Sequence, residues 1–252
     1  MSKSRLTLIV AAFLFLPAVA GAEGTTCANP TVIVPDGRLT TSTIPAGSTF
    51  VFAITSRVGS SYSVEFHNTL GPALQTPGTL TVYSAVACST PIATTDTKAI
   101  DPADLNGSRV SFTATTPLTF FSLANGSGNP ISYSFTVSET TMFSAAWSTN
   151  GAYDTFYSFL NTTAGTVNGT LTLYTVAGAQ VATNSFTINP NSTASVNTSG
   201  LAAPRNATGT AKFSHSGPPG AILAECAIAN FSITPTPYIQ IVKFAPTRES
   251  TH

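Results

Sequence analysis

The chain has 252 residues, of which only 8% are charged, and its ten basic and ten acidic side chains cancel to a formal net charge of zero. A chain without a basic stripe does not neutralise a row of phosphates, which excludes nucleic acid and an anionic membrane surface as expected partners. Hydrophobic residues make up 42% of the chain, which is enough to build a core and excludes disorder through lack of apolar material. The remaining residues are rich in Thr, Ser, Asn and Gly, a mixture that favours strands and turns and predicts an all-β fold.

The first 22 residues have the pattern of a signal peptide. A basic segment, MSKSR, precedes the apolar run LTLIVAAFLFLPAVAGA, which ends in small residues suited to cleavage after Ala20 or Ala22. The run is short for a membrane span and Pro17 interrupts it, which favours a cleaved signal over an anchor. We therefore expect a secreted or periplasmic protein with no membrane span after cleavage.

Residues 27–138 alternate apolar and polar side chains in short runs separated by Gly, Pro and Asn. Runs with this period of two are typical of half-buried antiparallel strands, and they occur at 48–55, 61–67, 79–84, 109–115 and 131–138. In the run 61–67, for example, Tyr62, Val64 and Phe66 share one face. This region is therefore predicted to be one antiparallel β-sandwich.

Three stretches of this region resemble the bacterial pre-peptidase C-terminal domain: IPAGSTFVFAITSRVGSSYSVEF, LTVYSAVACSTP and RVSFTATTPLTFFSLANGSGNPISYSFTV. The residues that match the family pattern are Gly59, Tyr62, Val64, Leu80, Val82, Tyr83, Tyr133, Phe135 and Val137. The resemblance spans residues 31–138 and implies a small β-sandwich, used by secreted hydrolases as an accessory module in export, substrate binding or solubility. The peptidase domain that precedes such modules is not found in this sequence.

Residues 141–246 contain a second series of strand patterns, at 154–161, 169–175, 180–188, 209–215, 222–232 and 238–244. Their order resembles β-sandwich domains of unassigned role in secreted bacterial proteins. We expect a second antiparallel β-sandwich in tandem with the first, followed by a polar tail at 247–252. The two regions do not read as copies of one repeat.

The segment WSTNGAYDTFYSFLNTT, residues 147–163, holds the only tryptophan of the chain. Both faces of its predicted strand carry apolar side chains, and a strand of that kind is usually covered on both sides. The pattern favours a place in the core, with Trp147 in the seam between the two regions, near a join at 139–146. The alternative is a ligand-binding site in which an exposed Trp147 and Tyr153 accept a sugar ring.

Three cysteines follow the signal segment, so at most one intrachain bridge can form. Cys27 and Cys88 lie in the same region and would pair in an oxidising compartment, where closing their loop contributes about 4 kcal/mol. Cys226 is in phase with the apolar Ile222 and Ile228, which predicts a buried, inert thiol rather than a nucleophile.

The loop DTKAIDPADLNGS offers Asp96, Asp101 and Asp104 as hard oxygen ligands for Ca²⁺. Their spacing differs from that of an EF-hand loop and Lys98 lies among them, so solvated carboxylates are the competing interpretation. No other cofactor is expected.

The sequence contains no G-x-S-x-G, H-E-x-x-H, P-loop or CxxC motif. We therefore predict a non-catalytic binding or structural module of the cell exterior or periplasm, with an extracellular glycan or protein as partner. The main alternative is a cryptic secreted hydrolase acting on carbohydrate, with Asp154 and Glu225 as paired carboxylates within about 10 Å in a cleft. A surface-structure or adhesion subunit is the third hypothesis. Eight N-x-S/T sequons would be open to glycosylation in a eukaryotic host.

Overall fold

The computed structural model describes residues 24–67, 78–84, 88–96 and 109–246, so the predicted signal segment and polar tail lie outside the described residues. The described residues form strands joined by turns and irregular segments. None of them belongs to a helix, and hence none to a helix able to cross a membrane. The all-β fold class is confirmed.

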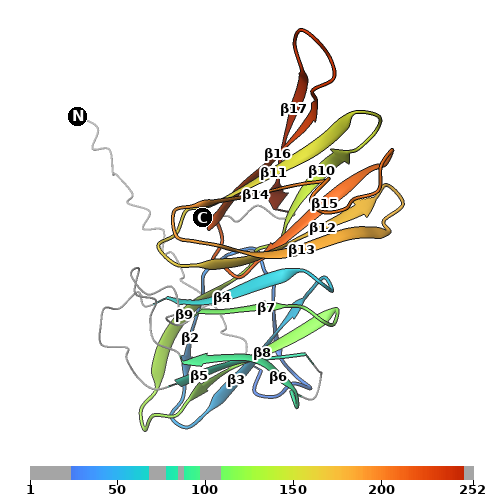
Figure 1. The fold of residues 1–252 in the computed structure, drawn as a ribbon. Helices are drawn as coiled ribbons and strands as arrows, with labels where there is room; N and C mark the ends of the chain where they lie inside the picture. The colour runs from blue at the N-terminus through green and yellow to red at the C-terminus, as the bar shows by residue number, and fades with distance from the viewer. Residues whose placement is uncertain (1–23, 68–77, 85–87, 97–108, 247–252) are drawn as a thin grey trace, which may run out of the picture.

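The N-terminal half consists of two sheets, drawn in the lower part of Figure 1. One has the order β1-β3-β8-β5-β6, with β1 (Thr31–Ile33), β3 (Thr49–Thr55), β5 (Gly78–Tyr83), β6 (Pro91–Asp96) and β8 (Leu118–Asn125). The other has the order β2-β9-β4-β7, with β2 (Thr40–Ile44), β4 (Ser61–His67), β7 (Arg109–Thr113) and β9 (Ile131–Glu139). Neighbouring strands are antiparallel except β1, which is parallel to β3.

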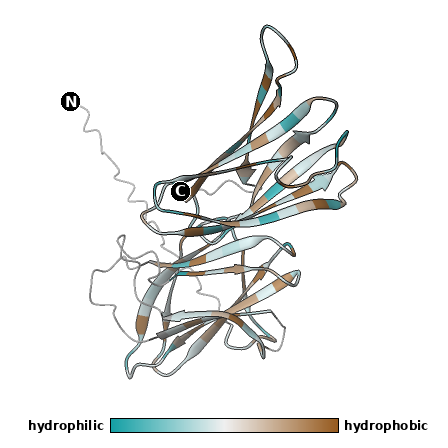
Figure 2. Cartoon of the chain, in the orientation of Figure 1, coloured by the Kyte–Doolittle hydropathy of each residue, from teal (hydrophilic) through white to brown (hydrophobic). Residues whose placement is uncertain are grey.

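The core of this half lies between the two sheets. The alternation of the strands, visible as colour banding in Figure 2, sends every second side chain inward. Tyr62 and Val64 of β4 are buried in this core as expected. At its centre the ring of Phe52 lies 5.1 Å from that of Phe121 and 5.0 Å from that of Phe135, between ring centroids. The strand faces predicted from period-two alternation are therefore correct here.

A disulfide joins Cys27 and Cys88, whose Cα atoms are 6.0 Å apart, as predicted. It packs against a small second cluster, formed by Val51, Ala53 and Phe120 on the opposite side of β3 from the core. Disulfides persist in oxidising environments, so this bridge points to a secreted or extracellular location.

The C-terminal half is also built from two sheets. One has the order β13-β12-β15-β10-β18, with β10 (Met142–Ser148), β12 (Val167–Thr175), β13 (Gln180–Ile188), β15 (Thr208–His215) and β18 (Ala245–Pro246). The other has the order β14-β11-β16-β17, with β11 (Tyr153–Asn161), β14 (Thr193–Asn197), β16 (Ile222–Asn230) and β17 (Tyr238–Lys243). All pairings in these sheets are antiparallel.

A separate core fills the space between these two sheets. Its centre is Phe159, which stacks on Phe213 with ring centroids 4.1 Å apart and meets Phe244 edge-on. No residue of this cluster belongs to the core of the N-terminal half. The division into domains at 27–138 and 141–246 stays a prediction, and its test is independent folding of the two segments.

The junction between the halves is shorter than the join expected at 139–146. β9 ends at Glu139 and β10 begins three residues later, which leaves only Thr140 and Thr141, both buried. Thr141 Oγ1 accepts a hydrogen bond from the backbone N–H of Ser61 at 2.7 Å. Thr140 Oγ1 donates one to the carbonyl of His215 at 3.4 Å. The observed junction therefore lies at the start of the expected join, and β10 occupies the rest of that range.

A buried asparagine ends a strand at an equivalent corner in each half, Asn125 at the end of β8 and Asn161 at the end of β11. The Nδ2 groups donate to the carbonyls of Ile44, Pro45 and Asn129 in the first case and of Ile188, Asn189 and Gly165 in the second. Each Oδ1 accepts both the N–H and the hydroxyl of the residue two positions further on. Both asparagines begin N-x-S/T sequons, so these two sequons are structural corners that no glycan could occupy in the folded chain.

Candidate functional site

Trp147 lies in the core of the C-terminal half. It is 1% exposed, and its indole Nε1 donates a hydrogen bond of 2.9 Å to the carbonyl of Tyr174. Trp147 lies inside this core and not in the seam between the halves, so its predicted place in the seam is wrong. Its ring also offers no free face to a sugar, and its proposed ligand-binding role is corrected to a structural one. Tyr153 is half-buried and meets Tyr238 edge-on, with ring centroids 6.0 Å apart.

The strand that follows Trp147 has one buried and one partly exposed face. Thr155, Tyr157 and Phe159 are buried on the inner face of β11. Phe156 points the other way and is 37% exposed. The expectation that both faces are covered is therefore wrong for the outer face, because among the described residues no third layer packs over this sheet.

The carboxylates of Asp154 and Glu225 do not form the predicted pair. Asp154 lies opposite Ala229 in the register, so it is four residues from Glu225 along β16, about 13 Å at 3.3 Å per residue. Asp154 Oδ1 instead binds Arg205 Nη1 at 2.6 Å and accepts a hydrogen bond from Thr198 Oγ1 at 3.0 Å. This arrangement does not suit an acid and a base acting on one glycosidic bond.

The proposed Ca²⁺ site falls largely outside the described residues. Asp101 and Asp104 are not among them, and for Asp96 only the backbone position at the end of β6 is described. The site stays a prediction. Within the described part of the chain, no group of three or more His, Cys, Asp or Glu side chains is placed to hold a metal ion.

Cys226 is a free and fully buried cysteine, as expected from its phase in β16. Its Sγ lies 3.5 Å from Ser144 Oγ and 3.7 Å from the carbonyl of Ala146. Burial raises the pKa of this thiol, against a smaller opposing effect of the Ser144 hydrogen bond. The thiol is therefore protonated at neutral pH and unsuited to nucleophilic attack.

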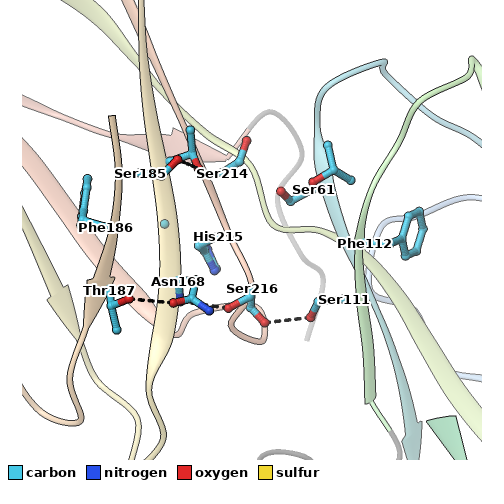
Figure 3. Close-up of a pocket in the computed structure, with 13 residues that line it drawn as sticks. Ser61, Ser111, Phe112, Asn168, Ser185, Phe186, Thr187, Ser214, His215 and Ser216 are labelled. Atoms are coloured by element: carbon cyan, nitrogen blue, oxygen red, sulfur yellow. Dashed lines mark hydrogen bonds between the residues drawn. The ribbon is translucent and has the colours of Figure 1, made fainter. Parts of the chain in front are cut away.

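A cleft of about 460 Å³ lies between the two halves (Figure 3). One wall is formed by β12, β13 and β15, and the other by β4 and β7. The side chains that line it are uncharged at neutral pH, and most carry hydroxyl or amide groups: Ser61, Ser111, Thr113, Asn168, Thr170, Ser185, Thr187, Ser214 and Ser216. The rings of Phe112 and Phe186 also contribute to the lining, but they pack against the two cores.

Strand alternation arranges the hydroxyls of the C-terminal wall in rows. Thr170 and Ser185 are directly opposite each other on β12 and β13, with their hydroxyl oxygens 2.8 Å apart. In the next row Thr187 Oγ1 donates to Asn168 Oδ1 at 2.9 Å. The outer face of this sheet is therefore a nearly uncharged, hydroxyl-rich surface.

Two hydrogen bonds carried by side chains tie the halves together beside the cleft. Ser111 Oγ donates to the carbonyl of Ser216 at 2.8 Å, as the dashed line in Figure 3 shows. Lys212 Nζ donates to the carbonyl of Gly59 at 2.9 Å. The two walls are thus held at a defined separation.

Ser214 Oγ is buried and has no hydrogen-bond partner among the described residues, and the buried imidazole of His215 meets the backbone of Gly217. Burial lowers the pKa of His215 to about 4, the positive charge of Arg109 adds to this, and the backbone of Gly217 partly opposes it. The imidazole is therefore neutral at pH 7 and presents one donor and one acceptor. An unpaired buried polar group costs about 1–3 kcal/mol unless water or a ligand satisfies it.

Sequence reasoning missed this cleft. Its Ser and Thr residues were visible in the composition, but the two walls come from segments about a hundred positions apart, as the Ser111–Ser216 separation of 105 shows. The only available signal was the run of outward-facing hydroxyls in 168–187, which alternation places on one side of a sheet.

No family model matches the chain, and no curated protein matches it. Among solved structures, the chain is similar to the full extracellular region of zebrafish Gpr126/Adgrg6, at 10% identity and a TM-score of 0.27, over 88% of this chain and 34% of that one. It is also similar to the PBSX exported protein XepA, at 11% identity and a TM-score of 0.29, over 74% of this chain and 89% of that one. A fucolectin from the serum of striped bass, Morone saxatilis, is 6% identical with a TM-score of 0.27, over 82% of this chain and 85% of that one. The chain spans about a third of the length of the zebrafish region. With TM-scores below 0.3, none of these similarities supports a statement about function.

Proposed function

We propose that this protein is an exported, non-catalytic binding module that takes a neutral glycan in the cleft between its halves. The observation that carries the proposal is the lining of the cleft, in which most of the described side chains carry hydroxyl or amide groups. Each glycan hydroxyl both donates and accepts hydrogen bonds. Glycan hydroxyls therefore match such a lining better than an anion, a cation or an apolar ligand would.

Export is supported by two independent features. The Cys27–Cys88 disulfide suits an oxidising compartment. The first 22 residues have the composition of a signal peptide. The resemblance of residues 31–138 to the pre-peptidase C-terminal domain belongs to the same proposal, because those domains serve secreted hydrolases as accessory modules.

A non-catalytic role is favoured by the chemistry of the cleft. Among the described residues no carboxylate lines it, and the separation of Asp154 and Glu225 does not suit a glycosidase pair. His215 is held neutral, but no nucleophile or second acid–base group accompanies it within hydrogen-bond reach among the described residues. Binding without bond cleavage is the simplest function of such a site.

The test is a calorimetric titration of the mature protein with a panel of neutral oligosaccharides. Ser185→Leu places a bulky apolar side chain in the lining of the cleft and should weaken binding by about tenfold or more. Thr210→Leu is the matched control, because Thr210 is exposed on the outer face of the same sheet but does not line the cleft. The proposal fails if no neutral glycan binds, or if both variants bind as the wild type does.

The same panel tests the hydrolase hypothesis. Release of reducing sugar that is abolished in Glu225→Gln would replace the binding module by an enzyme. Intact oligosaccharides after prolonged incubation are the expected result.

A further inference from the structure

β17 is an edge strand with side chains exposed on both faces. Tyr238 is 48% exposed, Ile239 is 54% exposed and Ile241 is 55% exposed. One edge of the strand pairs with β16, and no described strand pairs with the other. Figure 1 shows the β16–β17 hairpin projecting from the end of the C-terminal half, and Figure 2 shows apolar colour along it.

The apolar surface continues from β17 onto its neighbours. Phe231, in the turn before β17, is 60% exposed. Leu223 on β16 is also exposed, but Glu225 and Lys243, which lie opposite each other on the same face, separate it from Ile241. Phe231 meets Phe156 of β11 edge-on, with ring centroids 5.8 Å apart. Contiguous apolar patches of this kind on soluble proteins usually mark interaction sites.

We propose that β17 pairs with β17 of a second copy of this chain, antiparallel, about a two-fold axis at Gln240. The pairing joins the two sheets into one continuous eight-stranded sheet, since each copy contributes β14, β11, β16 and β17. It satisfies the backbone groups of the bare edge, which is the general driving force for strand addition.

The register follows from the side chains of the strand. With Gln240 opposite Gln240 of the partner subunit, Ile239 lies opposite Ile241 of the partner subunit, twice by symmetry. These pairs stand on the outer face, and β-branched cross-strand pairs are favourable. On the other face, Tyr238 lies opposite Val242 of the partner subunit, and the two Gln240 amides can bond to each other. Each residue from Tyr238 to Val242 therefore meets a compatible side chain of the second copy, and Lys243 lies opposite Pro237 of the partner subunit, beyond the end of the strand.

Charge also favours a second copy. Lys243 is the only charged residue of β17, and the chain has a formal net charge of zero. In the proposed register the two Lys243 side chains stand six residues apart at opposite ends, about 20 Å at 3.3 Å per residue. That is well beyond the screening length at physiological salt, so they do not repel each other appreciably. Edge strands that avoid pairing usually carry a central Lys, a Pro or a bulge, and Tyr238 to Val242 contain none of these.

The first test is sedimentation velocity of the mature, disulfide-bonded chain from micromolar to about 100 µM. A dimer is expected. Ile241→Lys should weaken it by about tenfold or more, because the lysine would face Ile239 of the partner subunit in an apolar pair. Leu223→Lys is the control, since it adds the same charge to the same exposed face but away from the edge.

The second test fixes the register by oxidation. Gln240→Cys should form an interchain disulfide, because directly opposite Cβ atoms lie about 5 Å apart. Lys243→Cys should stay uncrosslinked, because its two copies are far apart. Unchanged Trp147 emission in each variant shows that the fold is retained. A monomer at every concentration overturns the proposal, and so does a dimer that Leu223→Lys breaks and Ile241→Lys does not.

Discussion

Replacement of His215 by glutamine should change how the stability of the protein depends on pH. The imidazole is 5% exposed, and burial together with the charge of Arg109 lowers its pKa from 6.5 to about 4. The unfolded chain, with an unperturbed histidine, therefore binds a proton more readily than the folded chain. The stability that comes from a neutral His215 is complete above about pH 6.5 and is lost as the pH falls from there toward about 4.

The size of this effect follows from the shift in pKa. At 1.36 kcal/mol per pKa unit, a fall from 6.5 to about 4 corresponds to about 3 kcal/mol of unfolding free energy. A single domain is typically stable by about 5–15 kcal/mol, so the loss is large enough to measure. Glutamine is neutral at every pH, so the variant lacks this pH-dependent contribution to the unfolding free energy.

The assay is urea unfolding of wild type and His215→Gln at about pH 7.5 and about pH 4, followed by the emission of Trp147. This tryptophan is the only one in the chain, and it reports on the half that contains His215. All other titrating groups are common to both proteins, so their contributions cancel in the difference. The wild type should lose about 3 kcal/mol more than the variant between the two pH values.

Parallel losses of stability in the two proteins would refute this reasoning. They would mean that His215 keeps an ordinary pKa in the folded state, either because water reaches Nδ1 or because a carboxylate approaches it. The assignment of a neutral imidazole to His215 in the cleft lining would then be wrong as well.

Three further predictions concern stability. Asn161→Ala should lower the unfolding free energy by about 3 kcal/mol, because three carbonyls lose their donor, and a loss below about 1 kcal/mol in urea would contradict the role of the corner. Gly209→Ala should lower the thermal midpoint, because a Cβ there would overlap the carbonyl of Tyr174, and a midpoint equal to the wild type would show that the backbone yields freely. Cys27→Ser combined with Cys88→Ser opens a bridge spanning 61 residues and should cost about 4 kcal/mol, read from the urea midpoint, and an unchanged midpoint would argue against the bridge.

Local patterns in the sequence determined the strands and many of their faces. The run 180–188 was predicted as a strand and is β13, Gln180–Ile188. The inward phase of Tyr62 and Cys226 also followed from alternation alone. These inferences succeed because side chains of a strand alternate by stereochemistry, whatever the strand packs against.

The tertiary structure alone decided which faces are covered. Trp147 was predicted to be structural and to lie in the seam, with an exposed sugar site as the alternative, but β10 carries it into the core of the C-terminal half. The outer face of β11 and both faces of β17 carry large apolar side chains, and they are exposed because no described layer lies over them. The cleft likewise exists because folding brings Ser111 within 2.8 Å of the Ser216 carbonyl. Periodicity along a strand predicts the direction of each side chain, whereas its burial depends on which distant segment packs against that face.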